Sequence, residues 1–228
     1  IAFSEGLIAF HGAPASAKWR YSLELGEHAR KHNKLLQAKC LYQTTLHLNP
    51  SAAQVWLELA KLEEECGNLE AALRVMVQGA RECDGDETLL IKTLKQYERL
   101  GDASGARAIL HAVMHLNLNK SWRVVVEGAL MEARLGSDHT ARRVFKFLRQ
   151  HVSWYGPVYL EAARFEEQRQ CLRAAHEHVE QGLRACPRYG PLWLALLRVH
   201  GKLLLQAVAQ RERAILLGVA GCSSQRHG

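Results

Sequence analysis

Apolar residues recur at helical spacing along most of this chain. In residues 55–73, written VWLELAKLEEECGNLEAAL, they lie three and four positions apart and mark one face of an amphipathic helix. Gly67 and Asn68 interrupt this pattern, and a second helical stretch begins directly after them. The sequence therefore predicts a helical hairpin here, with a first helix, a glycine turn and a second helix.

The hairpin pattern is repeated with a period near 34 residues. Large residues open the copies at spacings of 34, 35, 34 and 34, at Trp56, Leu90, Val125, Tyr159 and Trp193. Sixteen positions after each of them stands an alanine: Ala72, Ala106, Ala141, Ala175 and Ala209. Four positions after each stand Ala60, Leu94, Ala129, Ala163 and Leu197, and seven positions after, three copies carry a glutamate, at Glu63, Glu132 and Glu166. A fixed period of this length, built from two helices, is typical of solenoids.

These observations predict an all-α fold, an α-solenoid of stacked antiparallel helix pairs with a ~34-residue period. A single globular bundle is the alternative, but a bundle rarely keeps one register through five copies. We expect residues 1–18 to be an N-terminal segment or the end of a preceding repeat, and residues 19–217 to form about five to six repeats. Residues 218–228 are expected to be a flexible tail, and the apolar stretch 203–221 to supply the last second helix and a cap.

The repeats resemble a known family. The aromatic, small and alanine positions are similar to those of the tetratricopeptide repeat (TPR). The glutamate in WLELAKLE, GALMEARLG and YLEAARFEE, and the Ala-Arg pair in GARAIL and TARRVF, are similar to the half-a-tetratricopeptide (HAT) repeat of RNA-processing proteins. The resemblance covers about residues 19–215, although four residues depart from the HAT pattern: Leu90, Tyr97, Val125 and His200.

The resemblance implies a non-catalytic scaffold of a ribonucleoprotein complex that acts in RNA processing or RNA maturation. Such a scaffold binds other proteins and, directly or through the complex, RNA. Similar repeats occur in spliceosomal and organellar proteins, which implies an intracellular protein of the nucleus, mitochondrion or plastid. Two alternatives stay open: a tetratricopeptide-type protein–protein adaptor with no RNA role, and a structural subunit of a large organellar complex.

In the tetratricopeptide arrangement, which the chain resembles, the first helices line the concave face. This implies that eight basic residues lie there, namely Lys92, Lys95, Arg99, Arg123, Arg134, Arg164, Arg198 and Lys202. They are candidates for binding RNA or an acidic partner, because Arg and Lys pair with phosphate and carboxylate groups. The alternative is that they only keep an exposed face soluble.

The charge of the chain is compatible with an acidic partner. The formal net charge is +7, and residues 101–228 hold 18 Lys and Arg against 10 Asp and Glu. A charge of this size is also common on ordinary soluble proteins. Some charges have candidate partners within their own hairpin, because Glu63 can pair with Arg74, and Glu132 with Arg142; the alternative is that all four are solvated.

The sequence contains no catalytic or cofactor motif, since it lacks a phosphate-binding GK[ST] loop, Gly-x-Ser-x-Gly and His-Glu-x-x-His. The pairs His28/His32 and His111/His115 have no Cys or acid at metal-ligand spacing, and zinc takes three or four protein ligands. Six scattered cysteines without a CxxC indicate reduced, intracellular thiols. We therefore predict no enzyme, no cofactor, no metal and no small-molecule substrate. The N-terminal apolar run LIAF is far too short to span a membrane, so no membrane insertion is expected.

Overall fold

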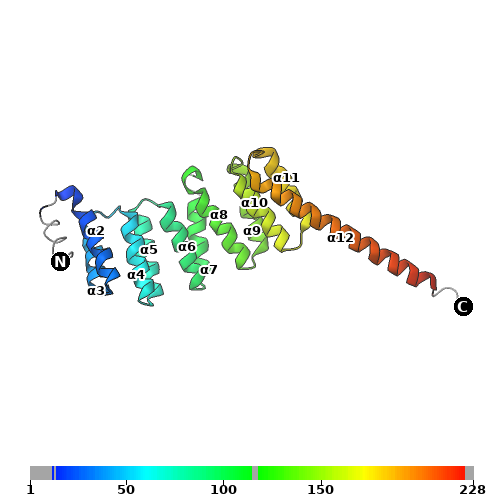
Figure 1. Cartoon of the computed structure of the whole chain (residues 1–228). Coiled ribbons are helices and arrows are strands. Elements are labelled where there is room, and N and C mark those ends of the chain that lie inside the picture. Colours follow the sequence, from blue (N-terminus) through cyan, green and yellow to red (C-terminus); the bar gives the residue numbers. More distant parts are fainter. Residues whose placement is uncertain (1–11, 13, 115–117, 224–228) are drawn as a thin grey trace. The chain divides into compact units, whose positions relative to one another are not determined.

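The structure is a computed structural model, and it describes residues 12, 14–114 and 118–223. His115 and most of the predicted N-terminal segment therefore lie outside the described residues. Over the described ranges the chain forms eleven helices and no strand (Figure 1). The helices are α2 (Ala15–Lys31), α3 (Leu35–Leu48), α4 (Ala53–Glu65), α5 (Leu69–Glu82), α6 (Glu87–Arg99), α7 (Ala103–Met114), α8 (Leu118–Arg134), α9 (Asp138–His151), α10 (Gly156–Gln168), α11 (Leu172–Ala185) and α12 (Gly190–Ser223).

The chain divides into two compact units, residues 1–131 and residues 132–228. In the first unit, α2 packs on α3, α4 on α5, and α6 on α7, while α3–α4 and α5–α6 contacts join one hairpin to the next. In the second unit, α10 packs on α11, and both α9 and α12 contact α10. The predicted all-α solenoid of stacked antiparallel helix pairs is therefore confirmed.

The turn inside each hairpin depends on one residue in the left-handed region. Eleven positions after the start of each repeat, φ is positive at Asn33 (58°), Gly67 (80°), Gly101 (74°), Gly136 (75°) and Gln170 (59°). Glycine and asparagine adopt this conformation at little cost, whereas other residues lose roughly 1–2 kcal/mol. This position ends the first helix and lets the chain reverse.

The last repeat lacks this turn. The corresponding position is Leu204, with Leu205 after it, and neither residue favours positive φ. The chain accordingly continues as one helix, α12, to Ser223. The expectation that residues 203–221 form a separate second helix is therefore wrong, because that stretch extends the first helix of the repeat. The boundaries at residues 18 and 217 stay predictions.

The repeat-signature residues form the core wherever a hairpin is complete. Five alanines at the second-helix position are fully buried: Ala38, Ala72, Ala106, Ala141 and Ala175. The first-helix residues Trp56, Ala60, Glu63, Glu132, Tyr159, Ala163 and Glu166 are buried as well. In α12, by contrast, Trp193 is 51% exposed and Leu197 is 72% exposed. The difference arises because no second helix among the described residues covers α12.

Two hairpins bring a large ring against a helical glycine. A Cβ atom on Gly79 would lie 2.6 Å from Trp56 Cγ, and one on Gly182 would lie 2.7 Å from Tyr159 Cβ. Both glycines stand 23 positions after the aromatic residue that they face. At the same positions of another repeat, Leu90 is matched by Val113, and both are buried. Close packing of the two helices therefore requires a small residue opposite a large one.

Candidate functional site

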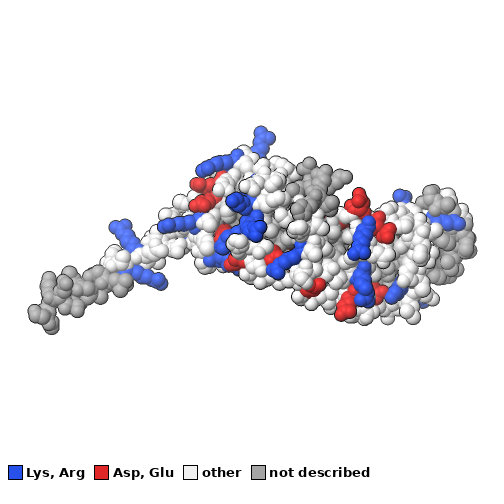
Figure 2. Space-filling view, turned by 180° about the vertical axis from the view of Figure 1, so that it is seen from behind, with Lys and Arg blue, Asp and Glu red and all other residues white. Residues whose placement is uncertain are grey.

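The predicted basic residues lie on the first helices α6, α8, α10 and α12, as the repeat register requires. In the first unit they pair with acids of neighbouring hairpins. Arg99 lies 3.3 Å from Glu64, Arg123 lies 3.4 Å from Glu87, and Lys95 lies 3.7 Å from Glu127. Figure 2 shows red side chains next to blue ones at several places on the visible face.

In the second unit, one carboxylate holds two of the candidate residues. Glu167 on α10 accepts hydrogen bonds from Arg198 (2.9 Å) and Lys202 (2.6 Å) on α12. Burial alone would raise the pKa of Glu167, but these two hydrogen bonds outweigh it, and the pKa of Glu167 is lowered. Arg164 pairs with Glu161 on its own helix at 2.6 Å.

These pairs change the interpretation of the basic residues. Apart from Glu161, the acids come from first helices one repeat away, so these paired charges join consecutive hairpins. Exposed ion pairs of this kind contribute only about 0–1 kcal/mol each. Of the eight candidates, Lys92 is exposed and makes no ion pair with any described residue. A phosphate or acidic peptide would therefore have to compete with resident carboxylates at most of the positions.

Two of the buried glutamates also pair between hairpins. Arg142 on α9 donates to both carboxylate oxygens of Glu166 on α10, at 2.7 and 2.8 Å. Lys39 on α3 lies 2.6 Å from Glu63 on α4. The prediction that Glu63 pairs with Arg74 and Glu132 with Arg142 is wrong. The reason is that the second helix of one hairpin lies against the first helix of the next, so the partner stands 24 residues before the glutamate.

The Arg142–Glu166 pair has an asymmetric environment. The side chain of Glu166 is only 4% exposed, whereas that of Arg142 is 46% exposed. The hydrogen bonds to Glu166 raise the pKa of Arg142, so the guanidinium stays charged. Arg142 also lies above the ring of Phe165, 5.5 Å from its centroid. The pair therefore fixes the register of α9 on α10.

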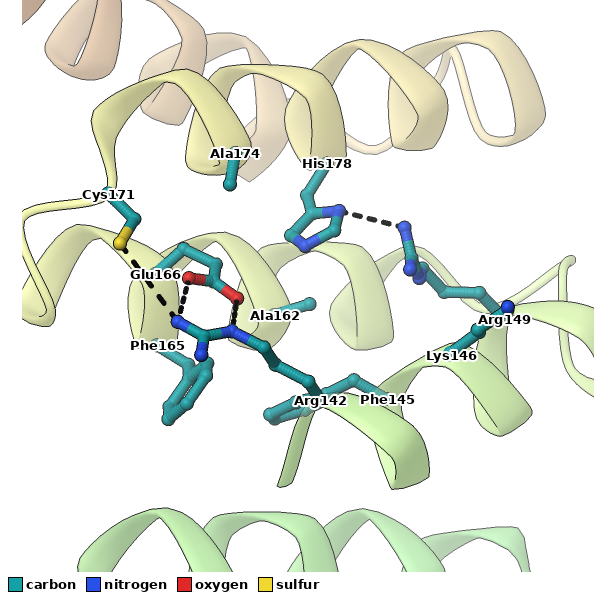
Figure 3. Close-up of a pocket in the computed structure, with 10 residues that line it drawn as sticks. All are labelled: Arg142, Phe145, Lys146, Arg149, Ala162, Phe165, Glu166, Cys171, Ala174 and His178. Atoms are coloured by element: carbon teal, nitrogen blue, oxygen red, sulfur yellow. Dashed lines mark hydrogen bonds and ion pairs between the residues drawn. The ribbon is translucent and has the colours of Figure 1, made fainter. Parts of the chain in front are cut away.

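A cavity of about 440 Å³ opens beside this pair, between α9, α10 and α11 (Figure 3). Arg149 on α9 donates from Nη1 to His178 Nδ1 (2.7 Å) and to Gln181 Oε1 (2.6 Å), both on α11. Because Nδ1 accepts this bond, neutral His178 carries its proton on Nε2. Sequence reasoning missed this cavity, since its residues come from two hairpins and belong to no motif.

His178 is held neutral in this cavity. Burial first, and then the neighbouring positive charge of Arg149, lower the pKa of His178 from 6.5 to about 4. Arg142 adds to this lowering, and Glu166 opposes it. Burial also lowers the pKa of Arg149.

We expect the second unit to become less stable at acidic pH because of His178. Between pH 6.5 and 4 the unfolded chain binds the His178 proton and the folded chain does not, so stability is full above pH 6.5 and falls as pH drops. With allowance for partial exposure, the loss is on the order of 1–2 kcal/mol. Hydrogen exchange of α9 and α11 amides from pH 7 to 4 measures it.

His178→Gln keeps an acceptor for Arg149 and removes the titration. This variant should therefore lose less stability between pH 7 and 4 than the wild type does. The same change at His139, which is exposed on α9, should leave the loss of stability as in the wild type. Equal acid sensitivity in His178→Gln and the wild type would contradict this account.

No group of three or more potential metal ligands occurs within the described ranges. The free cysteines Cys40, Cys66, Cys83, Cys171 and Cys186 are exposed or half-buried. Burial raises the pKa of Cys186, so that thiol is not poised as a thiolate.

Comparison with known proteins gives a family match. A family model described as "PRP6, TPR-like domain" matches residues 13–222. A TPR-containing protein of Dictyostelium discoideum is 41% identical over 189 residues, which are 83% of this chain and 14% of that protein. The chain therefore spans a small part of the relative's length.

Solved structures agree on the fold. A tetratricopeptide repeat protein from Parabacteroides merdae matches with a TM-score of 0.52 and 22% identity, over 94% of this chain and 82% of that one. PilF of Pseudomonas aeruginosa matches with a TM-score of 0.54 and 15% identity, over 90% and 91% of the two chains. At these identities the likeness concerns the fold alone.

Proposed function

Because the chain belongs to the PRP6 TPR-like domain family, we propose that it is a scaffold that binds protein partners in an RNA-processing complex. It is a TPR/HAT-like repeat protein, and folds of this class are typically non-catalytic scaffolds that mediate protein–protein interaction. The family match supports the assignment to RNA processing. A location in the nucleus or in an organelle is part of the proposal.

The observation that carries the proposal is the uncovered face of α12. Its first half packs on α10 and α11, and the rest extends away from them (Figure 1). Large apolar side chains stand exposed at helical spacing along it, at Leu194, Leu197, Leu204, Leu205 and Val208. A stripe of this kind on a terminal repeat is typical of a surface that another element covers.

The repeat register indicates which element that is. In α4 and α5, the buried Ala60 packs against Ala72 and Met76 of its second helix. Leu197 occupies the position of Ala60, but within the described part of the chain no second helix lies beside it. We therefore assign this surface to an amphipathic helix of a partner protein that takes the place of the missing second helix.

A membrane is a different occupant for the same helix. Among the described residues, one segment, Gly190–Ile215, is long and apolar enough to cross a bilayer by length and composition alone. Arg198 and Lys202 lie inside this segment, and both bind Glu167 of α10. A bilayer span would have to break these ion pairs or bury them, so a partner helix is the better supported occupant.

Introducing a charge on this face tests the function. The full chain, tagged in cells, should retain identified RNA-processing proteins, and Leu197→Lys should lower their recovery about tenfold or more, because a buried leucine is worth about 1.5–3 kcal/mol. Leu36→Lys on α3 is the matched control, since Leu36 is also exposed and lies far from this face in sequence. It should leave recovery unchanged.

Three results would overturn the proposal. If Leu197→Lys recovers the RNA-processing proteins as well as the wild type does, the face of α12 does not bind them. Concentration-dependent self-association abolished by Leu197→Lys would make a second copy the occupant. Binding to phosphatidylcholine vesicles, lost in the same variant, would make it a membrane.

Direct RNA contact through the eight basic residues is a further part of the proposal. Its test is binding to single-stranded RNA and to acidic peptides across a salt series, with Arg123, Arg134, Arg164 and Arg198 replaced by alanine. RNA affinity that falls steeply with salt and is lost in this variant supports direct contact. The absence of RNA binding at every salt concentration would leave only contact through protein partners.

A further inference from the structure

The cavity between α9, α10 and α11 contains a guanidinium that its surroundings do not neutralise. Arg149 uses Nη1 for His178 and Gln181, which are both uncharged there. Its Nε is buried without an acceptor, and its Nη2 donates to no described residue. No carboxylate lies within ion-pair distance of Arg149 in the described part of the chain. A half-buried cation in this state retains donor capacity for an anion.

A second cation adjoins it on the same helix face. Arg142, Lys146 and Arg149 stand four and three positions apart on α9, so they form one stripe along the cavity (Figure 3). Glu166 neutralises Arg142. Lys146 is exposed and makes no ion pair with the described residues. The rim of the cavity therefore carries two positive charges that have no acid.

The walls of the cavity are apolar. Phe145 and Ala162 line it together with Phe165 and Ala174. A volume of about 440 Å³ accommodates one or two side chains, and an apolar wall with few polar groups is the usual composition of a binding pocket. The volume of the cavity and the two positive charges of its rim together fit one anionic side chain.

We propose that this cavity binds an acidic side chain of a partner protein, with Arg149 and Lys146 holding the carboxylate. The carboxylate would accept from Arg149 Nη2, on the side of the guanidinium away from His178. Its two cations lie on the second helix α9, so they are distinct from the eight basic residues of the first helices and from the exposed face of α12.

A protein ligand fits the cavity better than RNA. Phe145 is 2% exposed and Phe165 is 3% exposed, so neither ring offers a free face for stacking a base. A phosphate backbone also needs a row of cations along its path, whereas only two unneutralised cations are found here. A single carboxylate has two acceptor oxygens, one for each of these cations.

A peptide pair tests the proposal. The probe is acetyl-Leu-Glu-Leu-amide, and its control is the same peptide with glutamine in place of glutamate. Titrated into the isotopically labelled chain, the acidic peptide should shift amide resonances of α9 and α11 and bind at least tenfold more tightly than the glutamine peptide. Oligouridylate serves as the RNA arm, and tighter binding of it at this cavity would overturn the assignment to protein.

Variants on one helix locate the contact. Arg149→Ala should lower the affinity for the acidic peptide about tenfold or more. Arg143→Ala should leave this affinity unchanged, because Arg143 is exposed on α9 and has no partner among the described residues. Because Arg149 also holds α11, Lys146→Ala provides a variant that disturbs no described bond, and it should weaken binding about threefold to fivefold. Equal affinity of the two peptides, or no loss in Lys146→Ala, would overturn the proposal. Neither result bears on the test at Leu197.

Discussion

Arg142→Ala is expected to destabilise the second unit by about 2–3 kcal/mol. Removing one partner of a buried ion pair costs about 3–5 kcal/mol, because the other charge stays in the interior without compensation. Glu166 is in that position, with a side chain only 4% exposed and both oxygens bound by Arg142. The exposure of Arg142 admits some water to the carboxylate, which lowers the expected loss. Urea unfolding, with hydrogen exchange of α9 and α10 amides as the local readout, measures it.

A neighbouring arginine supplies the control for this change. Arg143→Ala removes the same side chain from the same helix at an exposed position with no partner among the described residues, so it should change stability by less than about 0.5 kcal/mol. Replacing Arg142 and Glu166 together by leucine should recover most of the loss, since an apolar pair needs no compensating charge. If Arg142→Ala and Arg143→Ala behave alike, the pair does not fix α9 on α10.

Gly182→Ala is expected to destabilise the same unit by about 2 kcal/mol, against the usual effect of alanine in a helix. A Cβ at Gly182 would lie 2.7 Å from Tyr159 Cβ and 2.9 Å from Leu192 Cδ1. Tyr159 Cβ sits next to the backbone, so α10 and α11 must separate, and overpacking of this kind costs about 1–3 kcal/mol. The gain in helix propensity, roughly 1 kcal/mol, offsets only part of that.

Gly201→Ala is the matched control. Gly201 lies inside α12, and a Cβ there would meet no atom within 4 Å. The same substitution should therefore stabilise its helix by up to about 1 kcal/mol. Thermal and urea unfolding should move in opposite directions for the two variants. If both Gly182→Ala and Gly201→Ala stabilise the protein, then Tyr159 and its helix move aside at Gly182 without measurable strain.

The sequence predicted the repeat because the signals for it are local. Alanine at the second-helix position and glycine in most turns each follow from one residue and its backbone conformation, and both recur at a fixed period. The absence of a turn at Leu204 was readable in the same way. It was missed because the apolar composition after that residue suggested another core helix.

Pairing between repeats was not predictable from those signals. Glu166 binds Arg142 because the second helix of one hairpin lies against the first helix of the next, and a repeat considered alone does not contain both. The same holds for the basic residues, where Arg99 meets Glu64 of the preceding hairpin. The cavity at Arg149 requires three helices at once, together with side-chain directions that sequence does not specify.

The ion pairs between hairpins mean that the repeat in the sequence is not the piece that can be cut from the protein. A chain trimmed to begin at α10 would keep a whole 34-residue copy and yet leave Glu166 facing water-poor surroundings without Arg142. A chain trimmed to begin at α4 would lack Lys39 and so leave the buried Glu63 without that partner. Minimal fragments for crystallisation or binding work should therefore start one helix earlier than the periodicity suggests.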